Sequence, residues 1–517
     1  MHPALDRRGN VRGAHRRRPV ALLASAVEVL LVLAAVLAAA GTRAVQAKDT
    51  SGPGPQEKGA WTTFDANPGN PSVNSFEKTI TASTVGQLSR LWSVELPDLA
   101  DERPILVRDQ VMADGRPHDV LYVTTDKGTL MARDAATGRK LWAVTPKNDN
   151  PKYTKASPAA DPAHNLVYSY GLDGKVHRFR ASTGQELQGG GWPVQVTRMK
   201  LSEKVSSALN LYHGYLYVTT ASFSGDAPPY QGHVVAINLK TGDSHVWNSL
   251  CNDHTHLLAL HECAANGGGI WGRPGVSPDP VTGNIFVAVS DGYFTVSKGG
   301  HDWGDSVVEL TPDATKVLDS YTPGDYATEA FQNRDIGSTE PTLLPEIRGS
   351  KTPYLAIQCG KEGMVRLLNR QDLSGKHGPG NVGGALQMLL LPDQAPTLAQ
   401  PLAWRDPEDG GVWVFVPTLG HVDAFRAVTS PQGVTRLKKA WYQPIASTSP
   451  VMAGNVLFTT SGAGVQALDP RTGKQLWSSA SKSAGGSIGH VHWEASIVAG
   501  GRLYVPDESS VLTAYAL

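Results

Sequence analysis

The stretch CNDHTHLLALHEC gathers residue types that bind metals, because His254, His256 and His261 lie between Cys251 and Cys263. Thiolates and imidazoles are ligands that zinc prefers, so one interpretation is a zinc site. In an oxidising compartment, two cysteines this close in sequence can instead form a disulfide, which removes both sulfurs as metal ligands. We expect the disulfide, and the zinc site is the alternative.

A second stretch, HVHWE, alternates imidazoles with a carboxylate. Because alternate side chains of a strand share a face, His490, His492 and Glu494 would lie together in an extended strand. Such a trio can hold a metal ion, but we expect a hydrogen-bonded polar strand. The sequence contains no Gly-x-Ser-x-Gly elbow, phosphate loop or H-E-x-x-H motif, and no C-x-x-C-H that would attach a haem.

The N-terminus has the composition of an export signal. Six arginines in residues 7–18 precede an apolar run over 19–40, which is interrupted by Glu28, and VQA at 45–47 offers small residues to signal peptidase. The apolar run is also long enough to span a bilayer, so residues 1–47 are either a cleaved signal peptide or a membrane anchor. The sequence therefore predicts an extracytoplasmic protein, secreted or anchored at the outer face of the cytoplasmic membrane.

The composition favours many short strands in one folded domain. Gly (54) and Pro (35) are abundant and charged residues make up only 18%. Lys plus Arg (47) equals Asp plus Glu (47), so no overall charge favours nucleic acid. Residues 48–60 are polar and rich in Gly and Pro, which predicts a linker before a folded body at 61–517. The third cysteine, Cys359, is expected to be buried, and the chain to act as a monomer.

The phrase LMARDAATGRKLW (130–142) returns as VQALDPRTGKQLW (465–477), with weaker copies between them. In these two copies Asp134 or Asp469 can accept hydrogen bonds from the backbone ahead of it, and Gly138 or Gly473 can adopt positive φ without a Cβ clash. Each copy is therefore a hairpin, and the chain is a repeat array.

A second recurring phrase, short and rich in small residues, marks where each unit begins. It occurs eight times, as RPILV (103), ASPAAD (156), SSALN (206), GRPGVSPD (272), STEPTLLP (338), QPLAW (400), STSPVMAG (447) and EASIVAG (494). About four strands per unit predict an all-β, eight-bladed β-propeller. The last unit is one strand short, and 88–97 is an outer strand without a blade, so we expect these two to pair and close the ring. The tryptophans of the outer strands are expected to fill the gaps between blades.

These repeats resemble those of the quinoprotein dehydrogenases, eight-bladed propellers that carry pyrroloquinoline quinone (PQQ) and calcium, and those of haem-free propellers with the same repeat. A longer stretch, GIWGRPGVSPDPVTGNIFVAVSDGYF (269–294), is similar to a group of secreted bacterial propellers. The same repeat also occurs in an outer-membrane assembly scaffold that binds no quinone, so the resemblance implies the fold more firmly than the chemistry.

The resemblance also implies roles for individual residues. Asp291 and Glu340 would hold calcium, which prefers oxygen ligands, and Arg273 would pair with the quinone carboxylates. The register of the family places Asn333 where the catalytic aspartate belongs, and a carboxamide cannot accept the proton of the substrate. Asp335 is the candidate for a displaced base. The adjacent cysteine pair found beside the quinone in many of these enzymes is missing.

The innermost strand of each blade begins at the mouth of the central channel, so residues just before the start phrases should converge there. That position selects Trp271, Arg273, Asp335, Glu340, His490, His492, Trp493 and Glu494. Aromatic rings, a guanidinium and polar groups suit a planar or sugar-like ligand. The alternative is that these side chains only cap strands and pair with one another.

Two functions are consistent with these observations. The first is a ligand-binding or interaction protein that presents the channel mouth to a small molecule, a carbohydrate or another protein. The second is a PQQ- and calcium-dependent dehydrogenase that oxidises an alcohol or a sugar, with Asp335 as its base. The missing base and the missing cysteine pair favour the first.

Overall fold

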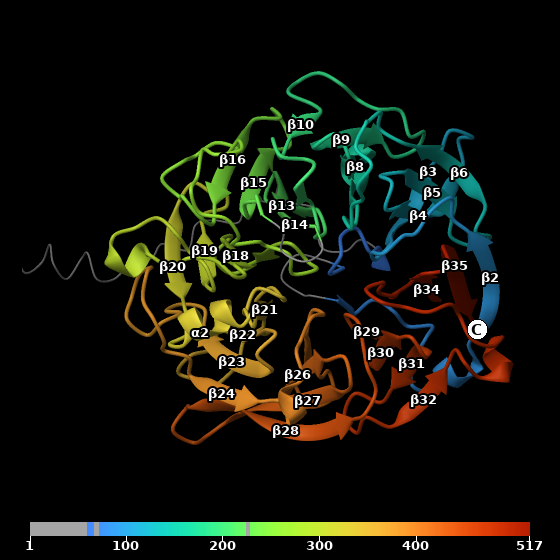
Figure 1. Ribbon diagram of the computed structural model, residues 1–517. Helices are drawn as coiled ribbons and strands as arrows, with labels where there is room; N and C mark the ends of the chain where they lie inside the picture. Colours follow the sequence, from blue (N-terminus) through green and yellow to red (C-terminus); the bar gives the residue numbers. More distant parts are fainter. Residues whose placement is uncertain (1–58, 67–71, 224–227) are drawn as a thin grey trace, which may run out of the picture. The chain divides into compact units, whose positions relative to one another are not determined.

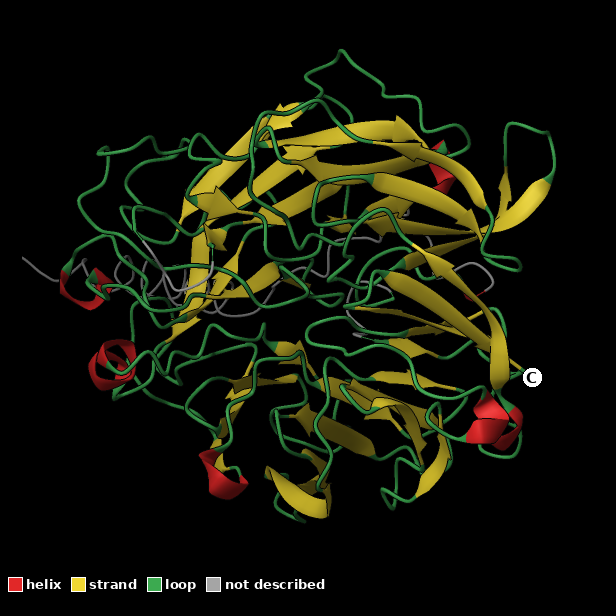
Figure 2. Cartoon of the chain, turned by 45° about the vertical axis from the view of Figure 1, so that its right-hand side comes forward, coloured by secondary structure: helices red, strands yellow, loops and turns green. Residues whose placement is uncertain are grey.

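The computed structural model describes residues 59–66, 72–223 and 228–517, which fold into a ring of β-sheets with a few short helices at its edge (Figures 1 and 2). The predicted signal peptide or anchor (1–47) and most of the predicted linker lie outside the described residues. Within the described part of the chain, none of the helices has the length and apolar character that a membrane crossing requires.

Eight sheets follow one another around the ring, and neighbouring strands within a blade are antiparallel. The first four are β3 (Ile105–Val111), β4 (Pro117–Thr124), β5 (Leu130–Asp134) and β6 (Lys140–Val144); β7 (Ala159–Asp161), β8 (Leu166–Gly171), β9 (Lys175–Arg180) and β10 (Val194–Gln195); β12 (Asn210–Tyr212), β13 (Tyr215–Thr219), β15 (His233–Asn238) and β16 (Ser244–Asn248); and β17 (Ser277–Pro278), β18 (Ile285–Ala288), β19 (Val307–Leu310) and β20 (Val317–Tyr321).

The next three sheets and the closing sheet complete the ring. They are β21 (Thr342–Leu343), β22 (Leu355–Cys359), β23 (Met364–Asn369) and β24 (Gln387–Leu390); β25 (Leu402–Arg405), β26 (Val412–Pro417), β27 (Val422–Thr429) and β28 (Thr435–Gln443); β29 (Val451–Ala453), β30 (Val456–Ser461), β31 (Gly464–Leu468) and β32 (Gln475–Ser478); and β33 (Ile497–Ala499), β34 (Arg502–Asp507), β35 (Val511–Ala516) and β2 (Ser89–Glu95). The helical pieces are α2 (Tyr326–Phe331) and the 3₁₀ turns Val85–Gln87, Pro162–His164, Val296–Lys298, Pro392–Gln394 and Lys482–Ala484.

The prediction of eight blades is confirmed, because each start phrase leads into the first strand of a sheet. The predicted closure is confirmed as well: β2 pairs antiparallel with β35, from Ser89 opposite Ala516 to Glu95 opposite Val511. The sequence did not predict β1 (Val73–Asn74), which pairs parallel with β29, or the two-stranded sheet of β11 (Glu203–Lys204) and β14 (Ala221–Ser222).

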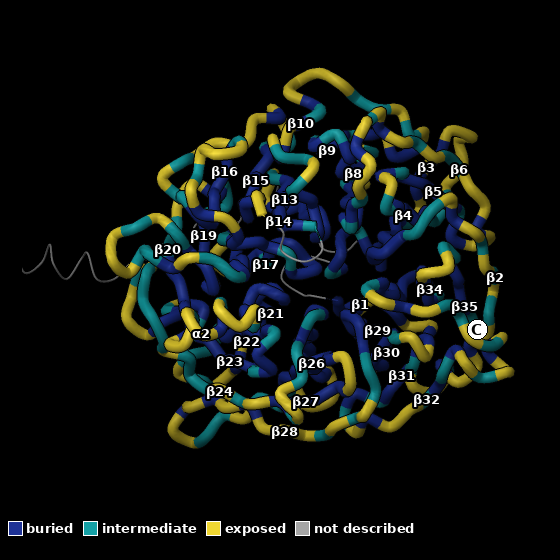
Figure 3. Tube along the Cα trace, in the orientation of Figure 1, coloured by how far each residue is buried: buried dark blue, intermediate teal, exposed yellow. Residues whose placement is uncertain are grey.

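The core of the ring lies between neighbouring sheets rather than inside each one. One apolar cluster, for example, joins Tyr168 and Tyr170 of β8 to Leu216 and Val218 of β13. Figure 3 shows the strands nearest the channel buried and the outermost strands partly exposed. Burial of apolar surface between sheets therefore holds the blades in their order.

The recurring hairpin phrase couples each blade to the one before it. Asp134 Oδ1 accepts hydrogen bonds from the backbone of Ala136 (3.1 Å) and Thr137 (2.9 Å), and Gly138 has a φ of +71°. A Cβ on Gly138 would lie 2.9 Å from the ring of Trp92 on β2. The glycine forms the turn, as predicted, and the tryptophan of the preceding blade fills the gap between blades, also as predicted; that the glycine provides the space for this ring is a finding of the structure.

The predicted disulfide between Cys251 and Cys263 is present, with an S–S distance of 2.00 Å. It closes the histidine-containing loop between the third and fourth blades. Cys359 is buried, as expected. Both sulfurs of the loop are consumed, so zinc cannot use them as ligands.

Candidate functional site

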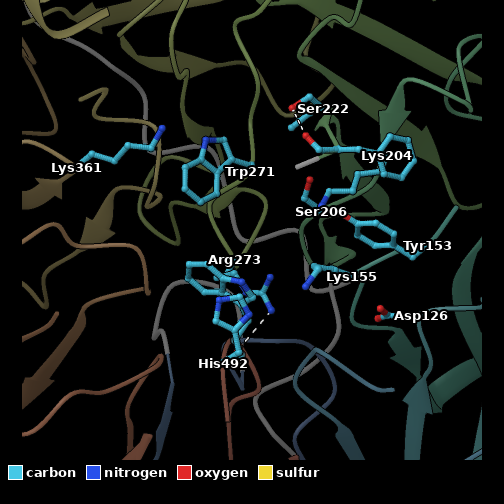
Figure 4. Close-up of a pocket in the computed structure, with 13 residues that line it drawn as sticks. Asp126, Tyr153, Lys155, Lys204, Ser206, Ser222, Trp271, Arg273, Lys361 and His492 are labelled. Carbon is cyan, nitrogen blue, oxygen red and sulfur yellow. Dashed lines mark hydrogen bonds between the residues drawn. The ribbon is translucent and has the colours of Figure 1, made fainter. Parts of the chain in front are cut away.

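A cavity of about 380 Å³ lies at one mouth of the channel (Figure 4). It is lined by segments that join consecutive blades and by turns between second and third strands, which antiparallel pairing brings to the same end of the ring. Its lining comprises Asp126, Tyr153, Lys155, Lys204, Ser206, Ala221, Ser222, Phe223, Trp271, Arg273, Lys361, His492 and Trp493.

Four residues expected at the channel mouth meet in this cavity: Trp271, Arg273, His492 and Trp493. The Arg273 guanidinium lies 5.7 Å from the ring centre of Trp493 and donates to the Asp101 carbonyl at 2.6 Å. His492 and Trp493 lie ring against ring at 4.6 Å. Residues from the fourth and eighth blade junctions therefore form one wall.

Three lysines also line the cavity, although they were not among the residues selected from the sequence. In Figure 4, Lys361 and Trp271 lie on one side and Lys204 and Lys155 on the other. Lys204 lies 4.7 Å from the ring centre of Tyr153, and Lys361 lies 5.2 Å from that of Trp271. The rule that selected Trp271 would also have found Lys155, which directly precedes the start phrase ASPAAD.

Buried acids lie behind these cations. The Glu102 carboxylate is 2.8 Å from the Arg273 guanidinium, and the Asp335 carboxylate is 2.6 Å from the Lys361 ammonium. Asp101 contacts the Lys155 ammonium. Asp101, Glu102 and Asp335 are 2%, 4% and 0% exposed and do not line the cavity, so the surface offered to a ligand is cationic.

Burial shifts the proton affinity of several groups here. Desolvation and the nearby Arg273 and Lys204 lower the pKa of Lys155 to about 7, while its contact with Asp101 acts in the opposite direction. Desolvation, together with Asp98, raises the pKa of Asp126 to about 7. The charge of the cavity is therefore sensitive to pH near neutrality.

Asp335, the candidate base, does not line this cavity. Its Oδ1 accepts a hydrogen bond from the Gly337 backbone at 3.0 Å, and its Oδ2 faces Lys361. Asn333 is exposed, and its side-chain oxygen accepts a hydrogen bond from the same Lys361. A general base must reach the proton that it removes, and this carboxylate reaches the lysine instead.

The two residues expected to hold calcium occupy different surroundings. Glu340 is completely buried, its Oε2 accepts a hydrogen bond from the Ala288 backbone at 2.8 Å, and burial raises its pKa well above the ordinary value. Asp291 lines another cavity, of about 660 Å³, beside Tyr293 and Tyr326. Glu340 does not line that cavity, so the two predicted calcium ligands do not meet in it.

No group of three or more acidic, histidine or cysteine side chains within residues 59–66, 72–223 and 228–517 is arranged to hold a metal ion. The planar rings and the cations of the cavity fit the flat, carboxylated quinone, but the donor set does not fit calcium.

The HVHWE stretch is not a strand, which corrects the prediction. It is an irregular segment with a bend at His492 and Trp493, and Glu494 Oε2 accepts hydrogen bonds from both of their backbone nitrogens, at 2.7 and 3.1 Å. The Glu494 carboxylate therefore stabilises the bend and is itself buried. His490 is exposed and pairs with Glu508 at 2.9 Å.

Residues 61–372 match the β-propeller domain of the glucose/ethanol/alcohol dehydrogenase family, and residues 396–517 match the outer membrane protein assembly factor BamB. The chain is 26% identical over 327 residues to a quinohemoprotein alcohol dehydrogenase, ADH-IIG, of Pseudomonas putida, covering 57% of this chain and 42% of that protein. It is 22% identical over 330 residues to a polyvinylalcohol dehydrogenase of a Pseudomonas species, covering 58% of this chain and 45% of the relative. The chain thus spans less than half the length of these curated relatives.

Solved structures show the same fold at low identity. A europium-containing methanol dehydrogenase superimposes with a TM-score of 0.64 and 16% identity, covering 89% of this chain and 99% of the other. The structure of ADHIIG from Pseudomonas putida gives a TM-score of 0.59 and 18% identity, covering 89% and 80%.

Proposed function

The chain belongs to the β-propeller family of glucose, ethanol and alcohol dehydrogenases, and from this premise we propose that it is an extracytoplasmic binding protein that holds a planar, anionic small molecule at the channel mouth. The observation that carries the proposal is the lining of the 380 Å³ cavity, where Lys155, Lys204, Arg273 and Lys361 lie among aromatic rings. Cations attract carboxylates, and aromatic faces stack on flat rings. The disulfide supports a location outside the cytosol.

PQQ is the probe that this chemistry suggests, because it is flat and carries several carboxylates. Lys204, Lys361 and Arg273 would face the carboxylates, and Trp271 would stack on the ring. When bound, the quinone can accept two electrons from a substrate. Asp335, the candidate base, does not line the cavity and is buried against Lys361, so we place binding ahead of alcohol oxidation.

The test is calorimetric titration of the purified protein with PQQ, with and without calcium. We expect saturable binding that does not require calcium. Lys204→Met should weaken it about tenfold, because one cation of the lining is lost while the length of the side chain is kept. Lys474→Met is the matched control, since Lys474 is exposed in the β31–β32 turn, at the opposite end of the ring. Equal effects of the two substitutions would argue against this site.

The dehydrogenase remains the second candidate because of the family to which the chain belongs. Its test is quinone-dependent oxidation of alcohols or sugars in the presence of calcium. We expect little or no turnover. Robust turnover that Asp335→Asn abolishes would overturn the binding proposal and make Asp335 the general base.

A further inference from the structure

A second cavity, of about 580 Å³, lies between the second and third blades. It is bordered by the β7–β8, β12–β13 and β15–β16 turns. In each blade, the turns that join the first strand to the second and the third strand to the fourth lie at one end of the ring. The turn that joins the second strand to the third lies at the other end, beside the channel-mouth cavity. The second cavity is therefore on the opposite face. Its wall is mainly apolar and includes Leu166, Tyr168, Leu211, Tyr212 and Leu239.

Three other blade junctions share a hydrogen bond that this junction lacks. In each of them, a tyrosine on the second strand of one blade donates its hydroxyl proton to a main-chain carbonyl in a turn of the next blade. The tyrosine lies opposite a residue of the first strand of its own blade. The pairs are Tyr504 to Ala135 at 3.1 Å, Tyr122 to Ala181 at 3.0 Å, and Tyr217 to Pro312 at 2.6 Å.

Tyr168 stands at the same register, opposite Ala159 of β7. Its side chain is 0% exposed, yet its hydroxyl has no hydrogen-bond partner in the protein. By position in the repeat, the carbonyl of Leu239 is the acceptor that it should reach. A buried hydroxyl without a partner costs about 1–3 kcal/mol, so this arrangement needs a reason.

The tryptophan of the same junction is also unpaired. The indole of Trp142 donates to the Ala181 carbonyl at 2.9 Å, whereas the buried indole nitrogen of Trp192 has no partner. Trp192 lies against Tyr168 of its own blade, with ring centres 5.3 Å apart, just as Trp142 lies against Tyr122 at 5.7 Å. At this junction the tyrosine thus lacks the acceptor that Tyr504, Tyr122 and Tyr217 reach, and the indole lacks the one that Trp142 reaches.

The sequence supplies the cause. Trp192 follows three glycines, and this glycine run takes the place of the indole ring on the next turn. A Cβ on Gly242 would lie 2.4 Å from the Gly190 carbonyl oxygen, whereas a Cβ on Gly184 would meet the ring of Trp142 at 2.6 Å. At this junction the backbone of the glycine run packs against Gly242, in the place where other junctions have an indole ring. The cavity lies beside this contact.

We propose that this cavity binds a small neutral molecule with a flat apolar body and one carbonyl oxygen, which accepts the hydrogen bond from Tyr168. A carbonyl is the acceptor at the other three junctions. An apolar wall favours a neutral body because burying an unpaired charge is costly. The ionisable side chains of the rim face one another or solvent: His164 is paired with Asp161 at 2.7 Å, and Lys240 is exposed. The volume lies within the range of small-molecule sites.

The test uses two probes of similar shape, acetophenone and ethylbenzene, of which only acetophenone has a carbonyl. Saturation-transfer NMR on the full-length protein should give a stronger signal for acetophenone. Tyr168→Phe should weaken acetophenone binding about tenfold and leave ethylbenzene unchanged. Trp271→Ala alters only the channel-mouth cavity and should leave the binding of both probes unchanged. A negative result with these probes is therefore distinguishable from a negative result of the PQQ titration.

Leu239→Trp provides the second variant, because its larger ring should fill the cavity and abolish binding of both probes. Circular dichroism and the melting temperature establish that each variant is folded. The proposal is overturned if the two probes bind equally well to the wild type, if Tyr168→Phe has no effect on acetophenone, or if the cavity takes up water only.

Discussion

Lys155, Lys204 and Lys361 present three ammonium groups to one cavity, and each residue comes from a different part of the ring. Two of these ammonium groups are held by acids that lie deeper in the protein, Asp101 and Asp335. An acid that is buried behind a lysine fixes its position without occupying the cavity. An anionic ligand therefore meets cations that are already oriented, which lowers the entropic cost of binding.

The affinity for PQQ should fall as the pH rises from 6 to 8. The pKa of Lys155 is lowered to about 7, so its amine loses charge above that pH, and the pKa of Asp126 is raised to about 7, so its carboxyl gains negative charge over the same range. Both changes make the cavity less positive. We expect a loss of about tenfold by calorimetry. Asp126→Asn should bind more tightly at pH 8 and depend less on pH, and an unchanged pH profile in that variant would contradict the assignment.

The hydroxyl of Tyr168 gives a prediction for stability without any ligand. Tyr122→Phe removes a 3.0 Å hydrogen bond to Ala181 and should lower the free energy of unfolding by about 1 kcal/mol. Tyr168→Phe removes a buried hydroxyl that has no partner, so its effect should be near zero or stabilising. Urea unfolding of both variants makes the comparison. A similar loss in both would mean that Tyr168 has an acceptor.

At the scale of elements, the hairpin and the outer strand of the preceding blade form one unit. Trp92, Trp142 and Trp441 each pack on the glycine of the next hairpin, where an added Cβ would come within 3 Å of the indole. Their indole nitrogens donate to the carbonyls of Ala135, Ala181 and Pro470. This contact explains why the aspartate, glycine and tryptophan recur together.

Gly184→Ala tests this contact, and Gly214→Ala is its control. Both glycines have positive φ, +73° and +82°, so both substitutions strain the backbone by about 1 kcal/mol. A Cβ at Gly184 would meet the Trp142 ring at 2.6 Å, whereas nothing lies within 4 Å of one at Gly214. Gly184→Ala should therefore cost about 1–3 kcal/mol more in denaturant unfolding. Equal losses would mean that the glycine serves only the turn.

Sequence reasoning succeeded where structure is set locally. Turn residues, alternating apolar positions and a strand without a blade were enough to predict eight blades and the pairing of β2 with β35. It failed where position depends on the finished ring. The strand β1 has two residues and no periodicity to detect, and the bend at His492 exists because Glu494 accepts two backbone hydrogen bonds.

The same reason applies to the candidate site. Trp271 and Arg273 were predicted because they lie at the beginning of a start phrase, whereas Lys361 lies in a turn inside a blade and only the ring brings it near Trp271. The burial of Asp335 behind Lys361 is likewise a property of the assembled fold. Residue type and spacing alone could not show that this carboxylate is buried against Lys361 and does not line the cavity.

At the scale of the whole molecule, the ring separates two kinds of site. Segments that join blades meet at the channel mouth and bring together charges from distant parts of the chain, while the turns of the opposite face enclose the cavity between the second and third blades. Both sites depend on the blades keeping their places. The pairing of β2 with β35, together with the backbone hydrogen bond from Leu96 to Ser510 beside it, links the first part of the ring to the last blade, so closure positions both sites.

A disulfide across the closure should stabilise the ring more than one inside a blade. Ser93 Oγ on β2 lies 2.9 Å from Thr513 Oγ1 on β35, so the Ser93→Cys, Thr513→Cys pair can bridge strands that are 420 residues apart in sequence. The control pair is Thr129→Cys, Thr145→Cys, with a 2.8 Å contact inside the first blade and a separation of 16 residues. The entropy lost by the unfolded chain grows with the size of the closed loop, so we expect a gain of about 6 kcal/mol for the closure pair and about 3 kcal/mol for the control. Denaturant unfolding of the oxidised and reduced forms gives both stabilisation energies. A closure disulfide without effect beside a stabilising control would show that the ring does not depend on this pairing.

Deletion of residues 510–517 is the second test of the closure, and it should lower the stability of the protein sharply because β2 then loses its partner strand. A truncated chain that melts like the full one would likewise show that the ring does not depend on the pairing of β2 with β35.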